Sequence, residues 1–360
     1  MALTFEHVTL GQRVLFGSGG AAENLASEVG RFNAKRVMVI ASERGSRDAA
    51  DVSSGIEVAL NYSDVAAHVP IDKAEKARAA ATDHRIDLIV SIGGGSTTGL
   101  AKAVAMTSGL PIIAVPTTYA GSEATNVWGL TEAARKTTGI DDAVLPATVI
   151  YDAALTLALP VDLSVASGMN AMAHCIDSMW APQADPINKA LATEGIRALS
   201  SGLPSIFKDP QDLPGREESL YGAYLSAVAF ASAGSGMHHK ICHVLGGTWG
   251  MPHAQVHAIL LPYVLAFNAP QAPDAAARIA GAFGAEDAVT GLNRLRAAVR
   301  APEALKDYGF AEKNIPEAVE LILPLIPASN PRLATPANLT ELLEAAWAGT
   351  DPAELPVEDS

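Results

Sequence analysis

A glycine-rich loop stands between an apolar β-branched run and an alanine-rich stretch with the composition of a helix. The loop consists of Gly93, Gly94, Gly95 and Ser96. Without Cβ atoms the backbone can approach a pyrophosphate closely, and the free N–H groups at a helix N-terminus favour negative charge. The order strand, glycine turn, helix therefore predicts a phosphate-binding loop. It matches neither the G-x-x-x-x-G-K-[ST] nor the G-x-G-x-x-G order, so a dinucleotide needs a second indication.

That second indication is a polar segment, Pro116-Thr117-Thr118-Tyr119-Ala120-Gly121-Ser122-Glu123, which leaves the carboxyl end of another strand-like run. Open α/β sheets bind ligands at that end, so the hydroxyls of Thr117, Thr118 and Ser122 could contact ribose or phosphate. Taken alone, the segment is equally well explained as an ordinary polar turn. The glycines of 17–19 are a weaker candidate of the same kind.

An amide and several histidines recur at helical spacing in the second half of the chain. They are Asn170, His174, His239, His243, His253 and His257. Residues four apart share a helix face, and several imidazoles in register favour a site over a single satisfied core histidine. Three imidazoles and an oxygen suit tetrahedral zinc or iron, but an Asn amide is neutral and a poorer ligand than a carboxylate. The set looks like a metal site without its anionic ligand.

The elements that must position these groups change in kind near Leu159-Pro160. Before that point β-branched runs alternate with alanine-rich stretches, which indicates a parallel sheet. The runs span 36–40, 66–69, 87–92, 112–115 and 148–151. Beyond it, strand-like runs vanish and Ala/Leu-rich segments are broken by Pro and Gly. We therefore expect a doubly wound parallel-sheet, Rossmann-like α/β domain over 1–159 and an all-helical domain over 160–360.

Length and composition agree with two globular domains and a cleft between them. The chain has 360 residues, 49% of them hydrophobic and 18% charged, which argues against disorder. The formal charge is −14 without a Lys/Arg cluster, so neither nucleic acid nor an anionic membrane is an expected partner. A few cations inside a cleft could still attract a small anionic substrate.

Compartment is indicated by what the sequence lacks. Cys175 and Cys242 are far apart in apolar helical patterns, so no disulfide framework is indicated. The first residues carry neither a basic nor an apolar targeting pattern, and no run has the length of a membrane span. We expect a cytoplasmic protein.

Nearly the whole chain, in motif order, resembles the iron-containing alcohol dehydrogenase family, which shares its architecture with dehydroquinate synthase and glycerol dehydrogenase. The glycine loop with Lys102 and the threonine segment resemble the family's two cofactor segments. Tyr151-Asp152, the run from Gly168 to His174, the run 239–243 and Pro252-His253 resemble its remaining motifs. The resemblance implies a dehydroquinate synthase-like fold, NADH or NADPH as cofactor, and a homodimer.

Three departures narrow the resemblance. Asn170 stands where the family has its first ligand, an Asp; Gly99 replaces another Asp; and the usual Pro-His-Gly is Pro252-His253-Ala254, followed by His257. Together they resemble the branch that reduces the carbon–carbon double bond of maleylacetate to 3-oxoadipate in aromatic-compound degradation. That branch is regarded as needing no metal. The resemblance thus implies a small dicarboxylate substrate and leaves Asn170, His174, His239 and His253 as a residual ligand-like set without a required metal.

The implied reaction adds hydride to the alkene carbon β to the ketone, forms an enolate and then needs a proton. Protonated imidazole or amide N–H groups can stabilise the enolate oxygen in place of a metal. His243, His253 and Asn170 are the candidates, with His174 and His239 beside them. His243 is favoured as the acid because its family counterpart lies near the nicotinamide.

Two further points of recognition follow from the resemblance. Ser42 occupies the place of an Asp that disfavours the 2′-phosphate of NADP, so both cofactors remain open. Lys240, Arg135 and Lys136 are candidate partners for the substrate carboxylates, with a solvated surface charge as the alternative for each.

Other functions remain open at this point. A metal-dependent alcohol or polyol dehydrogenase of the same fold could use Asn170 as an oxygen ligand. A lyase of the dehydroquinate synthase type would use the nucleotide only transiently. A catalytically silent nucleotide-binding protein is suggested by the missing Asp and opposed by the histidines.

Overall fold

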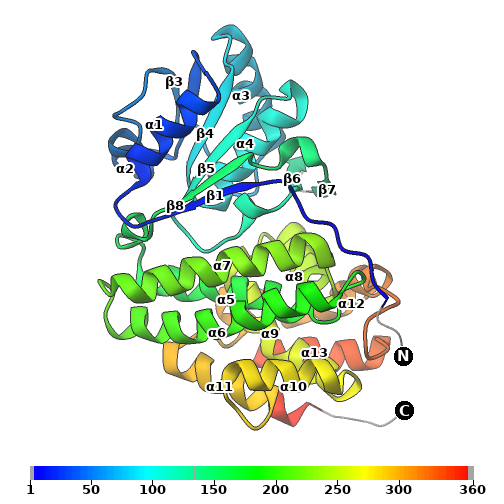
Figure 1. Cartoon of the computed structure of the whole chain (residues 1–360). Coiled ribbons are helices and arrows are strands. Elements are labelled where there is room, and N and C mark those ends of the chain that lie inside the picture. The colour runs from blue at the N-terminus through cyan, green and yellow to red at the C-terminus, as the bar shows by residue number, and fades with distance from the viewer. Residues whose placement is uncertain (1–3, 133–134, 356–360) are drawn as a thin grey trace. The chain divides into compact units, whose positions relative to one another are not determined.

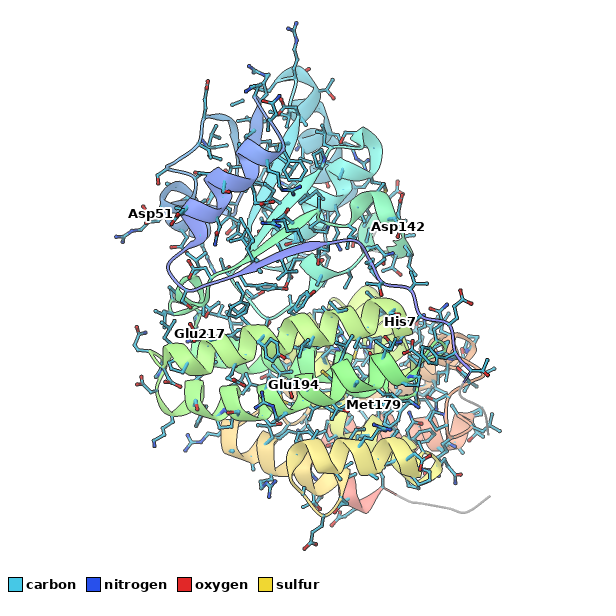
Figure 2. All side chains as sticks on the ribbon, in the orientation of Figure 1. His7, Asp51, Asp142, Met179, Glu194 and Glu217 are labelled. Carbon is cyan, nitrogen blue, oxygen red and sulfur yellow. The ribbon has the colours of Figure 1, made fainter. Side chains whose placement is uncertain are left out.

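The computed structural model describes residues 4–132 and 135–355, which fall into two compact units. One unit spans Leu10–Leu159. The other contains the described residues from Pro160 onward together with residues 4–9. The sequence analysis had placed those N-terminal residues in the α/β domain. His7 (Figure 2) links these residues to the helical unit, because its Nδ1 lies 2.8 Å from Oδ2 of Asp185. The other carboxylate oxygen of Asp185 caps a helix.

The α/β unit is built on a six-stranded parallel sheet in the order β1-β8-β5-β4-β2-β3 (Figure 1). Its strands are β1 (Arg13–Phe16), β2 (Val37–Ile40), β3 (Val58–Tyr62), β4 (Leu88–Gly93), β5 (Ile112–Pro116) and β8 (Thr148–Tyr151). The four inner strands are buried almost throughout. Continuous β-branched runs are what a parallel sheet needs when both of its faces are covered.

Helices cover both faces of this sheet, as Figure 1 shows. They are α1 (Ala21–Arg31), α2 (Ser46–Val52), α3 (Ile71–Asp83) and α4 (Gly95–Ser108). Val37 and Val39 pack in one core with α1 and α2, whereas Met38 and Ile40 pack in the other with α3 and α4. Alternate strand residues therefore fill two separate cores. The doubly wound fold class is confirmed.

The strand predicted at 66–69 is wrong. His68 and Val69 have φ values of 60° and 47°, outside the extended region, and form part of a turn. Their carbonyl oxygens instead accept hydrogen bonds from Thr131. Val69 is buried in the core that contains α4, which explains its apolar character. A short apolar run therefore does not distinguish a strand from a turn whose side chain is buried.

Four strands were not expected: β1 and β3, described above, and β6 (Val127–Glu132) and β7 (Arg135–Ile140). β1 forms an edge of the main sheet, and β6 pairs with β7 in an antiparallel hairpin. None of β1, β3 and β6 has the continuous burial of the inner strands. Their sequences accordingly lack the long β-branched runs on which the prediction relied.

The second unit is helical, as predicted. Its α-helices are α5 (Val161–Ser178), α6 (Pro186–Lys208), α7 (Leu213–Ala233), α8 (Met237–Trp249), α9 (His253–Asn268), α10 (Pro273–Phe283), α11 (Ala288–Val299), α12 (Ile315–Ile322) and α13 (Pro336–Ala348). Pro186 and Pro273 begin helices, where the missing N–H is no loss. Pro204 and Pro262 lie inside α6 and α9 instead of breaking them.

Close helix packing in this unit depends on glycine. A Cβ at Gly202 of α6 would lie 2.6 Å from the carbonyl oxygen of Gly215 in α7, so the two backbones leave no room for a side chain there. A separate core is shared by α8, α9, α12 and α13. Within the described ranges, no helix combines the length and apolar character needed to span a bilayer.

Acidic side chains lie on the surface of the α/β unit. Asp51 on α2 and Asp142 in a 3₁₀ turn, both labelled in Figure 2, are exposed. Because such carboxylates are exposed, they stay hydrated, and their negative charge carries no desolvation cost.

Glu28 of α1, by contrast, is buried. Its Oε1 accepts from Arg13 Nε of β1 at 3.0 Å, and its Oε2 accepts from Arg31 Nε and Thr148 Oγ1 at 2.8 Å. Burial alone would raise the pKa of Glu28, but the hydrogen bonds from Thr148 and Arg31 outweigh it and hold the pKa below 4.5. One carboxylate therefore fastens α1 to β1 and β8.

We predict that Glu28→Gln lowers the free energy of unfolding at pH 7 by about 1–3 kcal/mol, because two buried acceptor positions become one. Since the folded-state pKa is depressed, the carboxylate's stabilisation is present above its ordinary pKa and is lost as pH falls through the folded value. Urea unfolding at several pH values measures both effects. The exposed Glu75→Gln in α3 is the control, and equal stability of the two variants at pH 7 would contradict the prediction.

Candidate active site

The glycine loop joins the end of β4 to the start of α4, and its three glycines differ in what requires them. Gly93 has φ 150°, and a Cβ there would lie 2.6 Å from Thr97 Oγ1. A Cβ at Gly94 would lie 3.0 Å from Thr118 Cγ2, whereas one at Gly95 would make an ordinary 3.4 Å contact with Ala120. The fold thus requires glycine at Gly93 and Gly94, but it has room for a side chain at Gly95.

The N-terminus of α4 has the electrostatics of an anion site. No side chain caps it, and none of its described first-turn residues is acidic. Thr97 and Thr98 donate their backbone N–H groups to Gly94 O at 3.0 and 3.1 Å. The backbone N–H groups of the glycine loop and the dipole of this 14-residue helix therefore favour a negative group at this end. A pyrophosphate fits this loop.

The threonine segment lies beside the glycine loop. Gly93 and Pro116 are paired in register, and Thr117 N donates to Gly93 O at 3.1 Å. The methyl group of Thr118 lies close to Gly94, since a Cβ at Gly94 would be only 3.0 Å from it. Ser122 follows in a 3₁₀ turn, Ser122–Ala124. The two segments predicted to bind the cofactor are thus brought to one edge of the sheet.

Ser42 lies at the same edge. β2 and β4 are neighbours with Ile40 opposite Ser91, so Ser42 and Gly93, each two residues further on, are level with one another. Neighbouring strands are about 4.8 Å apart. Ser42 Oγ accepts from Gly45 N at 3.3 Å and brings no charge to this position.

Lys102 does not have the role predicted for it. Its buried Nζ donates to Thr125 O at 2.8 Å, to Thr125 Oγ1 at 3.2 Å and to Val127 O at 2.7 Å. Burial lowers the pKa of Lys102 to about 7, against the opposing charge of Glu123. An ammonium group has three donors, and all three are used. Lys102 therefore holds the chain after β5 and has no donor left for a phosphate.

The weaker glycine candidate at 17–19 is also accounted for by an internal contact. Asp152 Oδ1 accepts from Gly19 N at 2.8 Å, and its Oδ2 accepts from Ala21 N at 3.1 Å. The N-terminus of α1 thus already faces an anion supplied by the protein itself.

In the helical unit, three aromatic side chains from three helices form one cluster. His174 of α5 and His239 of α8 lie with ring centroids 5.0 Å apart and planes within 9°. Phe230 of α7 contacts both rings, at 4.7 and 4.3 Å between centroids. Both histidines are buried, and Asn170 lies one turn before His174 on the same helix.

His243 and His253 form a second, more accessible pair. Both are partly exposed, and their rings are near parallel with centroids 6.5 Å apart. His243 also meets the edge of His239 at 6.1 Å. The predicted histidines are therefore gathered around α5, α8 and the start of α9, with His243 and His253 nearer to solvent than His174 and His239.

Sequence reasoning missed His238. Its Nε2 lies 2.9 Å from His257 Nδ1 and 3.5 Å from Cys242 Sγ, all three residues being buried. The contact ties α8 to α9. The i, i+4 spacing of His238 and Cys242 is a signal that they share a helix face. His238 lies next to His239 in sequence and therefore faces a different side of the helix from the predicted histidines.

Asp177 was missed as well. Its Oδ2 accepts from Gly236 N at 2.8 Å and from His239 Nδ1 at 2.7 Å. Burial raises the pKa of Asp177 to about 6, and burial also lowers the pKa of His239 well below 6.5. The signal available in the sequence was its position three residues after His174 on one helix.

Six buried polar atoms in this cluster have no hydrogen-bond partner among the described residues: Asn170 Oδ1, His174 Nδ1, Asp177 Oδ1, His238 Nδ1, His239 Nε2 and His257 Nε2. Burial lowers the pKa of His174 to about 4, so this imidazole is neutral near pH 7. Buried polar atoms almost always have partners, so several unpartnered atoms on neighbouring side chains indicate where a polar ligand binds.

A resident metal ion does not fit this donor set. Asn170 is neutral, and the carboxylate oxygen bonded to His239 is already occupied by that ring and Gly236. In the described ranges, three ligand-type atoms converge within 4.8 Å at His238, Cys242 and His257, not at the family's positions. At this second group two nitrogens are already hydrogen-bonded to each other, and burial raises the pKa of the Cys242 thiol well above 9.

Cations for the substrate carboxylates are less well defined. Lys240 follows His239 on α8 and is partly exposed. The side chains of Arg135 and Lys136 lie outside the described part of the chain. Their role stays a prediction.

Both units match models of one family. Residues 11–153 match the model described as iron-containing alcohol dehydrogenase, and residues 164–347 match its C-terminal counterpart. Two similar relatives are maleylacetate reductases. That of Sphingobium indicum is 40% identical over 97% of this chain and 99% of its own, and that of Burkholderia cepacia is 41% identical over 94% and 97%.

Solved structures agree. An iron-containing alcohol dehydrogenase from Corynebacterium glutamicum has a TM-score of 0.97 and 62% identity over 99% of this chain and 100% of its own. Maleylacetate reductase from Rhizobium sp. has a TM-score of 0.91 and 39% identity over 97% and 99%.

We predict that Asn170→Asp binds Zn²⁺ at least about tenfold more tightly than the parent, because it restores an anionic oxygen beside the imidazoles of His174 and His239. Titration calorimetry measures the affinity. Asn61→Asp adds the same charge on β3, away from the histidines, and should change nothing. Equal Zn²⁺ affinity in parent and Asn170→Asp would show that Asn170 does not adjoin the imidazole nitrogens as argued.

Proposed function

We propose that this chain, which belongs to the iron-containing alcohol dehydrogenase family, reduces the carbon–carbon double bond of maleylacetate to give 3-oxoadipate. It is an oxidoreductase. The observation that carries the proposal is Asn170: the histidine cluster is kept while its anionic ligand is replaced by a neutral amide. Identity of about 40% to maleylacetate reductases over nearly the full chain supports the same substrate.

The dinucleotide, NADH or NADPH, supplies the hydride when it is bound. The α4 N-terminus and the bare backbone at Gly95 bind its pyrophosphate, and the hydroxyls of Thr117, Thr118 and Ser122 serve ribose and phosphate oxygens. Ser42 carries no charge that would repel a 2′-phosphate, so we propose that both cofactors are accepted.

On the substrate, hydride adds to the alkene carbon β to the ketone and the displaced electron pair moves onto the ketone oxygen. The resulting enolate is stabilised by hydrogen-bond donors, for which the amide N–H of Asn170 and the imidazole of His253 are proposed. His243 then gives a proton to the adjacent carbon and regains it from water. Its partial exposure allows that exchange, whereas His174 is buried and neutral.

We propose further that no metal is required. The electrophile is then a set of protein hydrogen-bond donors, which chelation leaves intact. A metal-dependent alcohol or polyol dehydrogenase is the other candidate, favoured by the retained His174, His239 and His253. Homodimer formation and a cytoplasmic location remain predictions from the family resemblance.

The deciding assay follows oxidation of NADH and, in parallel, of NADPH with maleylacetate, using simple aldehydes and diols as control substrates. Parent enzyme is measured before and after exhaustive chelation, with metal analysis of the same samples. Consumption of reduced cofactor with maleylacetate alone, unchanged by chelation, is the expected result. Turnover of diols or aldehydes that chelation abolishes and zinc or iron restores would replace the proposal by the second candidate.

We predict that Gly95→Val weakens NADH binding by at least about 100-fold, corresponding to roughly 3 kcal/mol, because the branched side chain stands where the pyrophosphate must approach. The fold should survive, since a Cβ at Gly95 meets only an ordinary contact. Calorimetry with NADH and thermal unfolding measure the two quantities. Gly30→Val, which has open space around its Cβ, is the control; undiminished affinity in Gly95→Val would remove the loop from the cofactor site.

We predict that His243→Phe lowers kcat with maleylacetate by about a hundredfold to ten-thousandfold, because a general acid contributes that much and phenylalanine keeps only the flat ring. NADH affinity and unfolding temperature should change little. Steady-state kinetics, calorimetry and thermal unfolding measure these quantities. A folded variant that binds NADH and works at nearly the parent rate would pass the proton-donor role to His253 or His239.

A further inference from the structure

Asp177 is fully buried and is surrounded by hydrogen-bond donors. Its Oδ2 accepts from Gly236 N at 2.8 Å and from His239 Nδ1 at 2.7 Å. The backbone N–H groups of His238 and His239, in the first turn of α8, are directed at the same carboxylate. One side chain of α5 therefore supplies the N-terminal cap of α8 and at the same time holds an imidazole of that helix.

Gly236 shows how closely this carboxylate is fitted. A Cβ at Gly236 would lie 2.4 Å from Asp177 Oδ1, although its φ of −91° would suit any residue. Glycine is therefore needed there for the close approach of the carboxylate, not for backbone conformation. Being glycine, it offers no side-chain cap of its own, and α8 depends on Asp177 for that function.

The contact also decides where His239 carries its proton. An ionised carboxylate only accepts hydrogen bonds, so Nδ1 must be the protonated nitrogen. In the neutral ring, Nε2 then keeps its lone pair. This Nε2 is buried without a partner, on a ring stacked against His174. The protein thus presents an acceptor, not a donor, at that point.

We propose that Asp177 is a positioning residue that fixes His239 in the tautomer with Nδ1 protonated and Nε2 free. The consequence for catalysis rests on the proposed function: neutral His239 cannot donate to the enolate oxygen, so that task falls to Asn170, His253 and His243. Asp177 acts on the reaction only through His239.

Asp177→Asn tests this with almost no change in shape. The amide replaces one acceptor oxygen by an NH₂ group, and with that group in the place of Oδ2 a donor faces Gly236 N and His239 Nδ1. Backbone N–H groups cannot lose their protons, whereas an imidazole can accept at Nδ1 if its proton moves to Nε2. His239 is therefore the group that should change, and its Nε2 should become a donor.

The first readout is the tautomer itself, from ¹⁵N NMR of protein labelled at histidine, with the His239 signals identified by their loss in His239→Gln. We expect Nδ1–H in the parent and Nε2–H in Asp177→Asn. The second readout is kcat with maleylacetate, which should change by at least about tenfold while KM changes little, because a donor replaces the acceptor at Nε2 beside the proposed catalytic groups.

Asp212→Asn is the matched control, because Asp212 likewise caps a helix, α7, through Gly215 N at 3.1 Å, and this cap involves no histidine. It should lose stability but leave the His239 tautomer and kcat unchanged. A purely structural Asp177 would behave in the same way as this control, and that result would overturn the proposal.

The parent spectrum decides the matter even if Asp177→Asn fails to fold, since Nε2–H in the parent would by itself overturn the proposal. The NMR result does not depend on the substrate. If the tautomer changes as expected but maleylacetate is not reduced by the parent, the proposed function fails while the positioning role of Asp177 stands.

Discussion

Parallel pairing is the constraint on which the cofactor-binding half depends, because it brings the carboxyl ends of successive strands to one edge. The register of β2, β4 and β5 places Ser42, the glycine loop and Thr117 level with one another, although they are far apart in sequence. Strand pairing also places Thr118, which follows the neighbouring strand β5, beside Gly94 of the glycine loop. The hydroxyls of the threonine segment are thereby added to the backbone donors of the glycine loop.

In the helical unit, buried polar contacts take the place of strand register. Apolar packing holds these helices together, and hydrogen bonds between buried side chains fix specific points of one helix against the next. The Asp177–His239 bond fixes α5 to α8, and the His238–His257 bond fixes α8 to α9. These two contacts set where His174, His239 and His253 stand relative to one another.

The sequence predicted features that repeat over several residues and missed those formed by single contacts. Four inner strands, the helical second unit and the histidine set follow from buried runs and helical spacing. The strand expected at 66–69 failed because one anchored valine imitates a strand, and β1 and β3 were missed because half-exposed strands carry little pattern. Lys102, His238 and Asp177 depend on contacts between distant segments, which no local spacing records.

The replacement of a carboxylate by Asn170 is more than the loss of one ligand, because Asp177 remains. A metal-binding histidine commonly donates its second N–H to a carboxylate, which leaves the other nitrogen free to bind the metal. His239 keeps that arrangement although the donor set has lost its anion. This contact leaves His239 as an acceptor, so the enolate stabilisation that we propose needs donors from side chains that Asp177 does not control. Asn170 meets that requirement, since the change from carboxylate to amide turns an acceptor into a group with two N–H donors. Under the proposed function, a single amide at Asn170 both makes a poorer metal ligand than a carboxylate and offers a donor to the enolate.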